Sequence, residues 1–332
     1  MRDRDRFRGC LIGGAAGDAL GYAVEFLRED TIFRRYGRKG ITEYELANGE
    51  AQISDDTQMT LFTAEGLMDP DAPGTTEGIR KAYLRWLKTQ EEPYLPNEAP
   101  PAGLLSVAGL YSRRAPGTTC MSSLEDGAHG TVEEPLNNSK GCGGVMRVAP
   151  VGLYACDRWD VRKTARMAAE AAALTHGHIL GWMPSAALAQ IVQEVSQDDT
   201  GIREAVKDAL DTAREMWPKT PARTLFAELI AQALELAEKG GNDVDAIHLL
   251  GEGWVGEEAL AIAVYCAVKY ADDPDRALIA AVNHSGDSDS TGAVAGNILG
   301  AKLGLSGIPE KYTERLELKD VILGTADALW ES

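Results

Sequence analysis

Long apolar runs are missing from this sequence of 332 residues. No stretch reaches the length of about 18 uninterrupted apolar residues that a membrane-spanning helix needs. The first residues, MRDRDRFRGC, alternate charges and do not lead into the apolar core of a secretory signal. We therefore expect a soluble protein without a membrane segment, and the cytoplasm is the default location.

Cysteine is also sparse, and its spacing excludes two classes of stabilised fold. The five cysteines are odd in number, lie far apart and form no Cys-x-x-Cys pair: they are Cys10, Cys120, Cys142, Cys156 and Cys266. This pattern favours neither a disulfide framework nor a zinc site. Reduced thiols agree with a cytosolic protein.

Positive charge is in short supply as well. The chain has 33 Lys and Arg against 51 Asp and Glu, which gives a formal net charge of −18. General binding to nucleic acid or to an anionic membrane is disfavoured, because the phosphate groups would be repelled over most of the surface. The same composition leaves carboxylates available for hard cations.

Alternating β-branched runs are scarce, and helical periodicity dominates instead. Only Gly40–Ser54, with its Asn48-Gly49 turn signal, resembles a short hairpin. With 44% hydrophobic residues the chain can bury a large core, so the sequence predicts an all-α protein. Apolar residues recur at spacings of three and four through residues 56–68, 76–89, 160–174, 179–196, 201–216, 221–238, 255–270 and 289–304.

The chain shows no low-complexity linker and no repeat of solenoid length. Its best loop candidate is the proline-rich segment Glu91–Leu105, which is also the one place where a domain boundary is conceivable. Candidate site residues lie on both sides of this segment. We therefore expect a single domain over residues 1–332.

Two stripes of glycine recur at every fourth position. They consist of Gly9, Gly13, Gly17 and Gly21 near one end of the chain, and Gly292, Gly296, Gly300 and Gly304 near the other. On a helix such residues share one face, and each costs about 1 kcal/mol relative to alanine. The stripes therefore predict close helix packing, which would bring distant parts of the chain together.

Two acidic clusters each stand just before a helical segment. The first is Ser54-Asp55-Asp56-Thr57, and the second contains Asp287, Asp289 and Ser290. Either cluster alone is explained by helix capping, with Asp289 or Ser290 at the start of the second helix. A cap needs only one oxygen acceptor, however, and each cluster supplies two carboxylates and at least one hydroxyl.

The surplus oxygens suit hard divalent cations. Two such ions about 3.5–4 Å apart can share a bridging carboxylate. Four Asp side chains with Ser54 and Ser290 fit a pair of this kind. The acids alone fit an enzyme acting on phosphoesters or diphosphates equally well.

These clusters resemble motifs of the ADP-ribosylglycohydrolase family, the relatives of dinitrogenase-reductase-activating glycohydrolase. The resemblance begins with GCLIGGAAGDALGYAVEF at Gly9–Phe26 and ends with SGDSDSTGAVAGNILGA. In order between them come RRAPGTTC, NSKGCGGVMRVAPVGL, ALTHGH and GWVGEEALAIAVYCA. Because these matches run over nearly the whole chain, together they are far more specific than any one motif.

The resemblance implies a compact orthogonal bundle of many helices, with at most a short hairpin, around a site for ADP-ribose and two Mg²⁺ or Mn²⁺ ions. Carried over by position, Ser54, Asp55 and Asp56 bind one metal. Asp287 and Ser290 bind the other metal, and Asp289 bridges the two.

The resemblance also implies roles outside the acidic clusters. Glu25 is the candidate general acid and base, with Asp55 or Asp56 as rivals, and Asp18 is expected to be structural. Side chains or backbone expected to contact the ligand belong to Ser139, Lys140, Gly141, Gly143, His176 and Gly117, the last in a loop with Arg113 and Arg114. His178, His284, Glu257 and Glu258 are expected to lie outside the site.

The expected activity is therefore metal-dependent hydrolysis of the bond between ADP-ribose and a modified protein side chain or a small molecule. An arginine linkage is slightly favoured over a serine linkage or an ester. Two alternatives stay open at this point: another two-metal hydrolase of phosphoesters or diphosphates, and a non-catalytic relative that binds ADP-ribose or serves a structural role.

Overall fold

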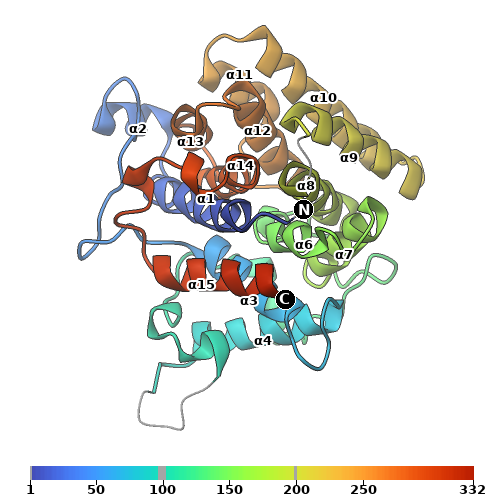
Figure 1. The fold of residues 1–332 in the computed structure, drawn as a ribbon. Helices are drawn as coiled ribbons and strands as arrows, with labels where there is room; N and C mark the ends of the chain where they lie inside the picture. The colour runs from blue at the N-terminus through green and yellow to red at the C-terminus, as the bar shows by residue number, and fades with distance from the viewer. Residues whose placement is uncertain (1, 96–101, 198–199) are drawn as a thin grey trace.

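The computed structural model describes residues 2–95, 102–197 and 200–332. These residues form fifteen α-helices and no β-strand, which confirms the all-α prediction. Figure 1 shows how the helices are arranged. None of the described helices is both long and apolar enough to cross a bilayer. The helices are α1 (Arg4–Tyr22), α2 (Glu29–Tyr36), α3 (Asp55–Leu67), α4 (Thr76–Glu91), α5 (Thr118–Glu125), α6 (Ala149–Ala155), α7 (Val161–Ala173), α8 (Ile179–Gln197), α9 (Ile202–Met216), α10 (Pro221–Lys239), α11 (Asp243–Leu250), α12 (Gly256–Lys269), α13 (Pro274–Val282), α14 (Ser288–Leu303) and α15 (Lys319–Glu331).

The predicted hairpin at Gly40–Ser54 does not form strands. Its turn is present, with left-handed φ angles of 55° at Asn48 and 91° at Gly49. The turn is closed by the hydrogen bond from Glu50 N to Ala47 O, at 3.2 Å, and by the reciprocal bond from Ala47 N to Glu50 O, at 2.9 Å. Beyond the turn, Ala51 bonds to Arg315 and Glu317 instead of extending the hairpin. Two bonds to a distant segment are too few to make a ladder.

The predicted loop at Glu91–Leu105 is described only in part. Helix α4 ends at Glu91, and a short 3₁₀ helix covers Gly103–Ser106. Residues 96–101 lie outside the described residues.

Helices α1 and α14 lie side by side in the middle of the molecule, as Figure 1 shows, and run antiparallel with their glycine faces in contact. A Cβ atom added at Gly17 would lie 1.9 Å from the carbonyl oxygen of Gly292, and one added at Gly296 would lie 1.9 Å from that of Gly13. Real Cβ atoms do not approach so closely. The close packing predicted from the stripes is therefore confirmed, and it brings both ends of the chain together.

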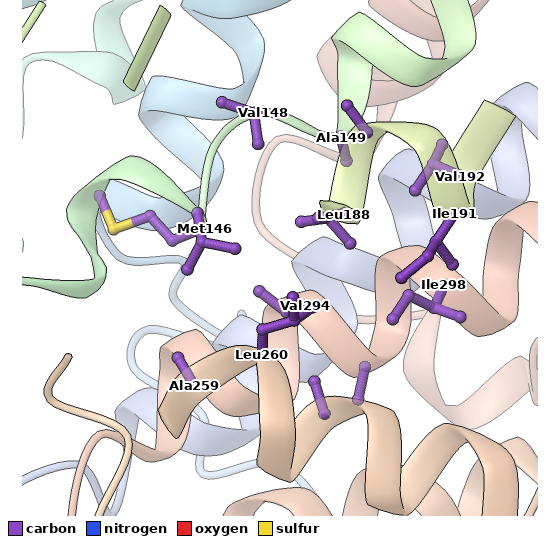
Figure 2. Packing of buried hydrophobic residues seen from close by; sticks show 14 of the residues in the cluster. Met146, Val148, Ala149, Leu188, Ile191, Val192, Ala259, Leu260, Val294 and Ile298 are labelled. Carbon is purple, nitrogen blue, oxygen red and sulfur yellow. The ribbon is translucent and has the colours of Figure 1, made fainter. Parts of the chain in front are cut away.

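Helix α14 is also supported by an apolar core. Leu188, Ile191 and Val192 of α8 lie near Val294 and Ile298 of α14, together with side chains of α12 and of the segment before α6 (Figure 2). All of these side chains are buried. Because a densely packed interior resists displacement, the first turn of α14 has a fixed position.

Candidate metal and ligand site

Both acidic clusters form the first turns of helices. Ser54 is the N-cap of α3, and its hydroxyl accepts from the backbone N–H of Asp56 at 3.2 Å. Asp287 is the N-cap of α14 and accepts from Ser290 N at 3.3 Å. The expectation that Asp289 or Ser290 caps this helix was wrong, because α14 begins one residue earlier. Asp289 also accepts from Ser290 N, at 2.9 Å.

Asp18 of α1 ties the first cluster to the α1–α14 pair. Its carboxylate is completely buried and accepts from Ser54 N at 3.0 Å and from Thr57 N at 3.1 Å. The hydroxyl of Thr57 donates to the same carboxylate. Asp18 therefore holds the start of α3 against α1, which is the structural role expected for it.

The acids line one cavity of about 400 Å³, a size found for small-molecule sites. Its walls come from the segment after α1, the starts of α3, α5 and α14, and the loops before α5, α6, α8 and α12. Ten of the predicted site residues line it: Glu25, Asp55, Asp56, Gly117, Gly141, Gly143, His176, Asp287, Asp289 and Ser290. Ser54 lies behind this wall, completely buried, as the cap of α3.

The carboxyl groups of the cavity are buried beside one another. Burial, followed by the charge of Asp289, raises the pKa of Asp55 and Asp56 well above the usual range. Burial and then the charges of Asp289 and Asp287 raise the pKa of Glu25 to about 10. Grouping this many carboxylates is unfavourable unless protons or cations neutralise them.

The available oxygens fit a hard cation. One oxygen each of Glu25, Asp287 and Asp289 lies within 4.8 Å of the others. Among the described residues, the Oε2 of Glu25 and the Oδ2 of Asp56 are buried and have no hydrogen-bond partner. Unpartnered buried carboxylate oxygens are the donors that Mg²⁺ and Mn²⁺ bind.

Two loops close the cavity around these acids. The backbone N–H of Gly117 donates to Asp55 Oδ2 at 3.3 Å. The thiol of Cys142 donates to Asp287 Oδ2 at 2.8 Å. Gly143 leaves room for the ring of His176, since a Cβ there would lie 2.8 Å from His176 Cε1.

The side chains of Ser139 and Lys140 are not brought to the cavity wall. The hydroxyl of Ser139 bonds to that of Thr119 at 3.1 Å. The ammonium of Lys140 pairs with Glu257 at 2.6 Å, and that carboxylate is buried. The ion pair holds the Lys140 ammonium at the start of α12, and Lys140 is not among the residues that line the cavity. Glu257 and Glu258 do not line the cavity, in agreement with the expectation that they lie outside the site.

The two arginines of the Gly117 loop are likewise outside the lining of the cavity. Arg114 pairs with Glu317 at 3.2 Å, and Arg113 is exposed to solvent. His178 accepts from Leu180 N at the start of α8, at 3.1 Å. His284 is buried, with its ring bonded to Ala281 O at 2.9 Å. Neither histidine lines the cavity, as expected.

Several lining residues were missed by sequence reasoning. Phe26 and Trp254 stack at 5.9 Å between ring centroids and form an exposed aromatic pair on the wall. Hydrophobic periodicity does not detect single exposed aromatic residues. The only sequence signals for this pair were that Phe26 follows Glu25 and that Trp254 lies in the GWVGEE motif. The other lining residues missed are Ala115, Pro116, Thr118, Thr119, Cys120, Cys142 and Met146.

The chain is similar to known proteins in both sequence and fold. The family model described as ADP-ribosylglycohydrolase matches residues 1–332. Human ADP-ribosylhydrolase ARH3 is 25% identical, over 95% of this chain and 90% of its own length. The ADP-ribosyl-[dinitrogen reductase] glycohydrolase of Rhodospirillum rubrum is 26% identical, over 95% and 91%. A solved structure titled ADP-ribosylglycohydrolase-related protein complex shares the fold, with a TM-score of 0.69 at 22% identity over 99% of this chain and 98% of that one.

Proposed function

Because the chain belongs to the ADP-ribosylglycohydrolase family, we propose that it is a metal-dependent hydrolase that releases ADP-ribose from a modified side chain or a small molecule. One observation carries the proposal. Carboxylates from near residues 25, 55 and 288 meet in a single cavity, although they are far apart in the sequence. A cavity of this composition suits a ligand that presents hydroxyl groups to cations.

We assign the metal ligands as the sequence predicts them. Ser54, Asp55 and Asp56 would hold one ion, Asp287 and Ser290 the other, and Asp289 would lie between them. Bound ions of this kind orient the hydroxyls of a ribose and stabilise negative charge near the scissile bond. Mg²⁺ and Mn²⁺ fit the oxygen donors equally well.

The chain's own residues supply the proton transfer in this proposal. Cleavage at an anomeric carbon passes through an oxocarbenium-like state, which a nearby carboxyl group assists by protonating the leaving group or activating water. Glu25 is the first candidate because it lines the cavity, one of its oxygens has no partner among the described residues, and our assignment gives it no metal. Asp55 and Asp56 are the rivals, and metal binding occupies them in our assignment.

The composition of the cavity wall supports one domain over residues 1–332, because segments before and after the proline-rich loop both line the cavity. A cytoplasmic location stays a prediction of the sequence.

Removal of metal provides the first test. We expect Mg²⁺ or Mn²⁺ to support release of free ADP-ribose from arginine-linked, serine-linked or O-acetyl substrates, and excess chelator to abolish it, because the acids then repel one another and the ribose is not oriented. Chromatography of the products measures this. Release of phosphate or AMP would instead favour a phosphoester or diphosphate hydrolase, and tight ADP-ribose binding without cleavage of any substrate would favour a non-catalytic relative.

The aromatic pair supports arginine as the slightly favoured leaving group. Phe26 directly follows Glu25, and its ring is 71% exposed, while Trp254 is 38% exposed. The two rings are nearly parallel, with an angle of 21° between their planes. A guanidinium group stacks on aromatic faces, and the acidic cavity attracts its charge.

Substitution of Phe26 tests this preference. Phe26→Leu keeps the apolar side chain but removes the aromatic face, so we expect KM for an arginine-linked substrate to rise about fivefold, the effect of one exposed cation–π contact. Phe26→Tyr keeps the ring and should behave like the unchanged protein. O-acetyl-ADP-ribose has no guanidinium, and its KM should not change in either variant. Equal changes for both substrates would contradict the arginine preference.

A further inference from the structure

Arg147 is completely buried behind the wall of the cavity. In the described part of the chain it has no carboxylate within salt-bridge distance. Its guanidinium lies 4.2 Å from the ring centroid of Tyr83 and donates to Ala171 O at 3.3 Å and to Thr175 Oγ1 at 2.7 Å. A buried charge without a counterion is costly, so this position calls for a reason beyond packing.

The hydrogen bond from Arg147 to Thr175 determines which atom donates in the hydrogen bond between Thr175 and His176. A guanidinium only donates, so the hydroxyl of Thr175 accepts from Arg147 and must place its own proton elsewhere. The nitrogen and oxygen acceptors near it are His176 Nδ1 at 2.8 Å and Ala172 O at 3.4 Å. The thiol of Cys120 also lies beside this hydroxyl, but its sulfur is a weak acceptor. The carbonyl of Ala172 already accepts from the backbone N–H groups of Thr175 and His176. Because a carbonyl oxygen has two lone pairs, the hydroxyl proton points to Nδ1.

This arrangement determines the protonation of His176. Burial, and then the charge of Arg147, lower the pKa of the imidazole to about 3, so the ring is neutral. A neutral ring that accepts at Nδ1 carries its proton on Nε2. The Nε2 atom lies beside the backbone of Gly141 and Gly143, 3.2 Å from where a Cβ of either residue would stand.

Within the described residues, Nε2 of His176 has no hydrogen-bond partner in the protein. The ring is 2% exposed and lines the cavity, as do Gly141 and Gly143. An unpartnered donor in a buried side chain at a cavity wall indicates that a ligand supplies the acceptor.

We propose that Arg147 and Thr175 are positioning residues that hold His176 as an Nε2–H donor to an oxygen of the bound ligand. In this arrangement His176 orients the ligand and transfers no proton. The identity of the ligand as ADP-ribose rests on the proposed function; the arrangement of the three side chains does not.

The tautomer can be measured by NMR on the folded, metal-loaded protein with ¹⁵N-labelled histidine, with His176→Gln used to assign the signal. We expect a pyridine-like Nδ1 and a pyrrole-like Nε2. Thr175→Val removes the donor, so the share of the Nδ1–H form should rise and the Kd of ADP-ribose should increase about tenfold. Thr175→Ser keeps the hydroxyl and should preserve both values.

A pyrrole-like Nδ1 in the unchanged protein would overturn the proposal without any variant. So would equal Kd values for the valine and serine variants, provided that both retain their thermal transitions. Neither measurement requires turnover. A protein that binds ADP-ribose but does not cleave its conjugates would therefore refute the proposed hydrolysis and leave the role of Arg147 and Thr175 standing.

Discussion

Asp289→Asn is expected to lower kcat/KM for ADP-ribose release about a thousandfold, which corresponds to about 4 kcal/mol. Asp289 lies in the first turn of α14, is buried, and raises the pKa of Asp55 and Asp56 through its charge. It therefore stands between the two halves of the acidic site, and its loss should weaken both metal positions. Steady-state kinetics over a series of Mn²⁺ concentrations measures the effect.

Ser290→Ala is the matched control for this substitution. Ser290 lines the same cavity and follows Asp289 directly, but it is assigned to one metal only. We expect a loss of about tenfold, in the range found when one oxygen near a metal is removed. Similar, mild losses in the two variants would contradict a bridging role for Asp289.

The metal-free protein offers a second measurement on the same variant. Burial and the charge of Asp289 raise the pKa of Asp18 to about 7. A carboxyl with a raised pKa stabilises the fold while it is protonated, and this contribution is lost as the pH rises from about 4 through the folded value. In chelator, Tm of the unchanged protein should therefore fall between pH 4 and pH 7. Asp289→Asn removes one of the repelling charges, so the Tm of this variant should fall less over the same pH range. An equal fall in Tm would show that Asp289 does not act on Asp18.

Helix prediction from the sequence succeeded where the apolar period was long. Each of the eight periodic segments is a helix whose ends lie within two residues of those predicted, as for residues 179–196 and α8. The helices that were missed are mostly short, such as α5 with 8 residues and α6 with 7. Two turns contain too few apolar positions to establish a period, and such helices form because tertiary packing stabilises them.

The acids of the site were predicted because they exceed what capping needs. Asp55, Asp56, Asp287 and Asp289 all reach one cavity. Lys140 could not be placed in the same way, since its direction depends on Glu257, which lies 117 residues later in the chain. The wall formed by Phe26 and Trp254 also depends on a tertiary contact. Arg147 did carry an unused signal, because a single arginine in the apolar run GVMRVAPVGL is expected to be buried with polar partners.

The contact between α1 and α14 explains how two acidic clusters more than two hundred residues apart share a site. Asp18 follows Gly17 on α1, and Gly292 lies one turn after Asp289 on α14. Any side chain on the shared glycine face would separate the two helices. Asp18 would then move relative to Asp289, and with it the start of α3 that Asp18 holds.

Gly17→Ala is accordingly expected to reduce the free energy of unfolding by about 3 kcal/mol, the upper end of what overpacking a core costs. The new Cβ would stand 1.9 Å from the carbonyl oxygen of Gly292, and backbone on both sides leaves no side chain to move aside. Chemical denaturation of the metal-free protein measures the loss. Gly324→Ala on α15 is the control, because no atom of the described part of the chain lies within 4 Å of its Cβ position. Removing a helix-interior glycine there should stabilise the fold by up to about 1 kcal/mol.

A second variant separates the stability of the helix pair from its role at the site. Gly296→Ala meets the carbonyl oxygen of Gly13 at the same 1.9 Å, but it lies about two turns from Asp289 along α14. Both alanine variants should lose similar stability, whereas Mn²⁺ affinity, measured by calorimetry at a temperature where both are folded, should fall further in Gly17→Ala. If the two variants bind Mn²⁺ equally well, the glycine contact stabilises the fold without setting the geometry of the acids.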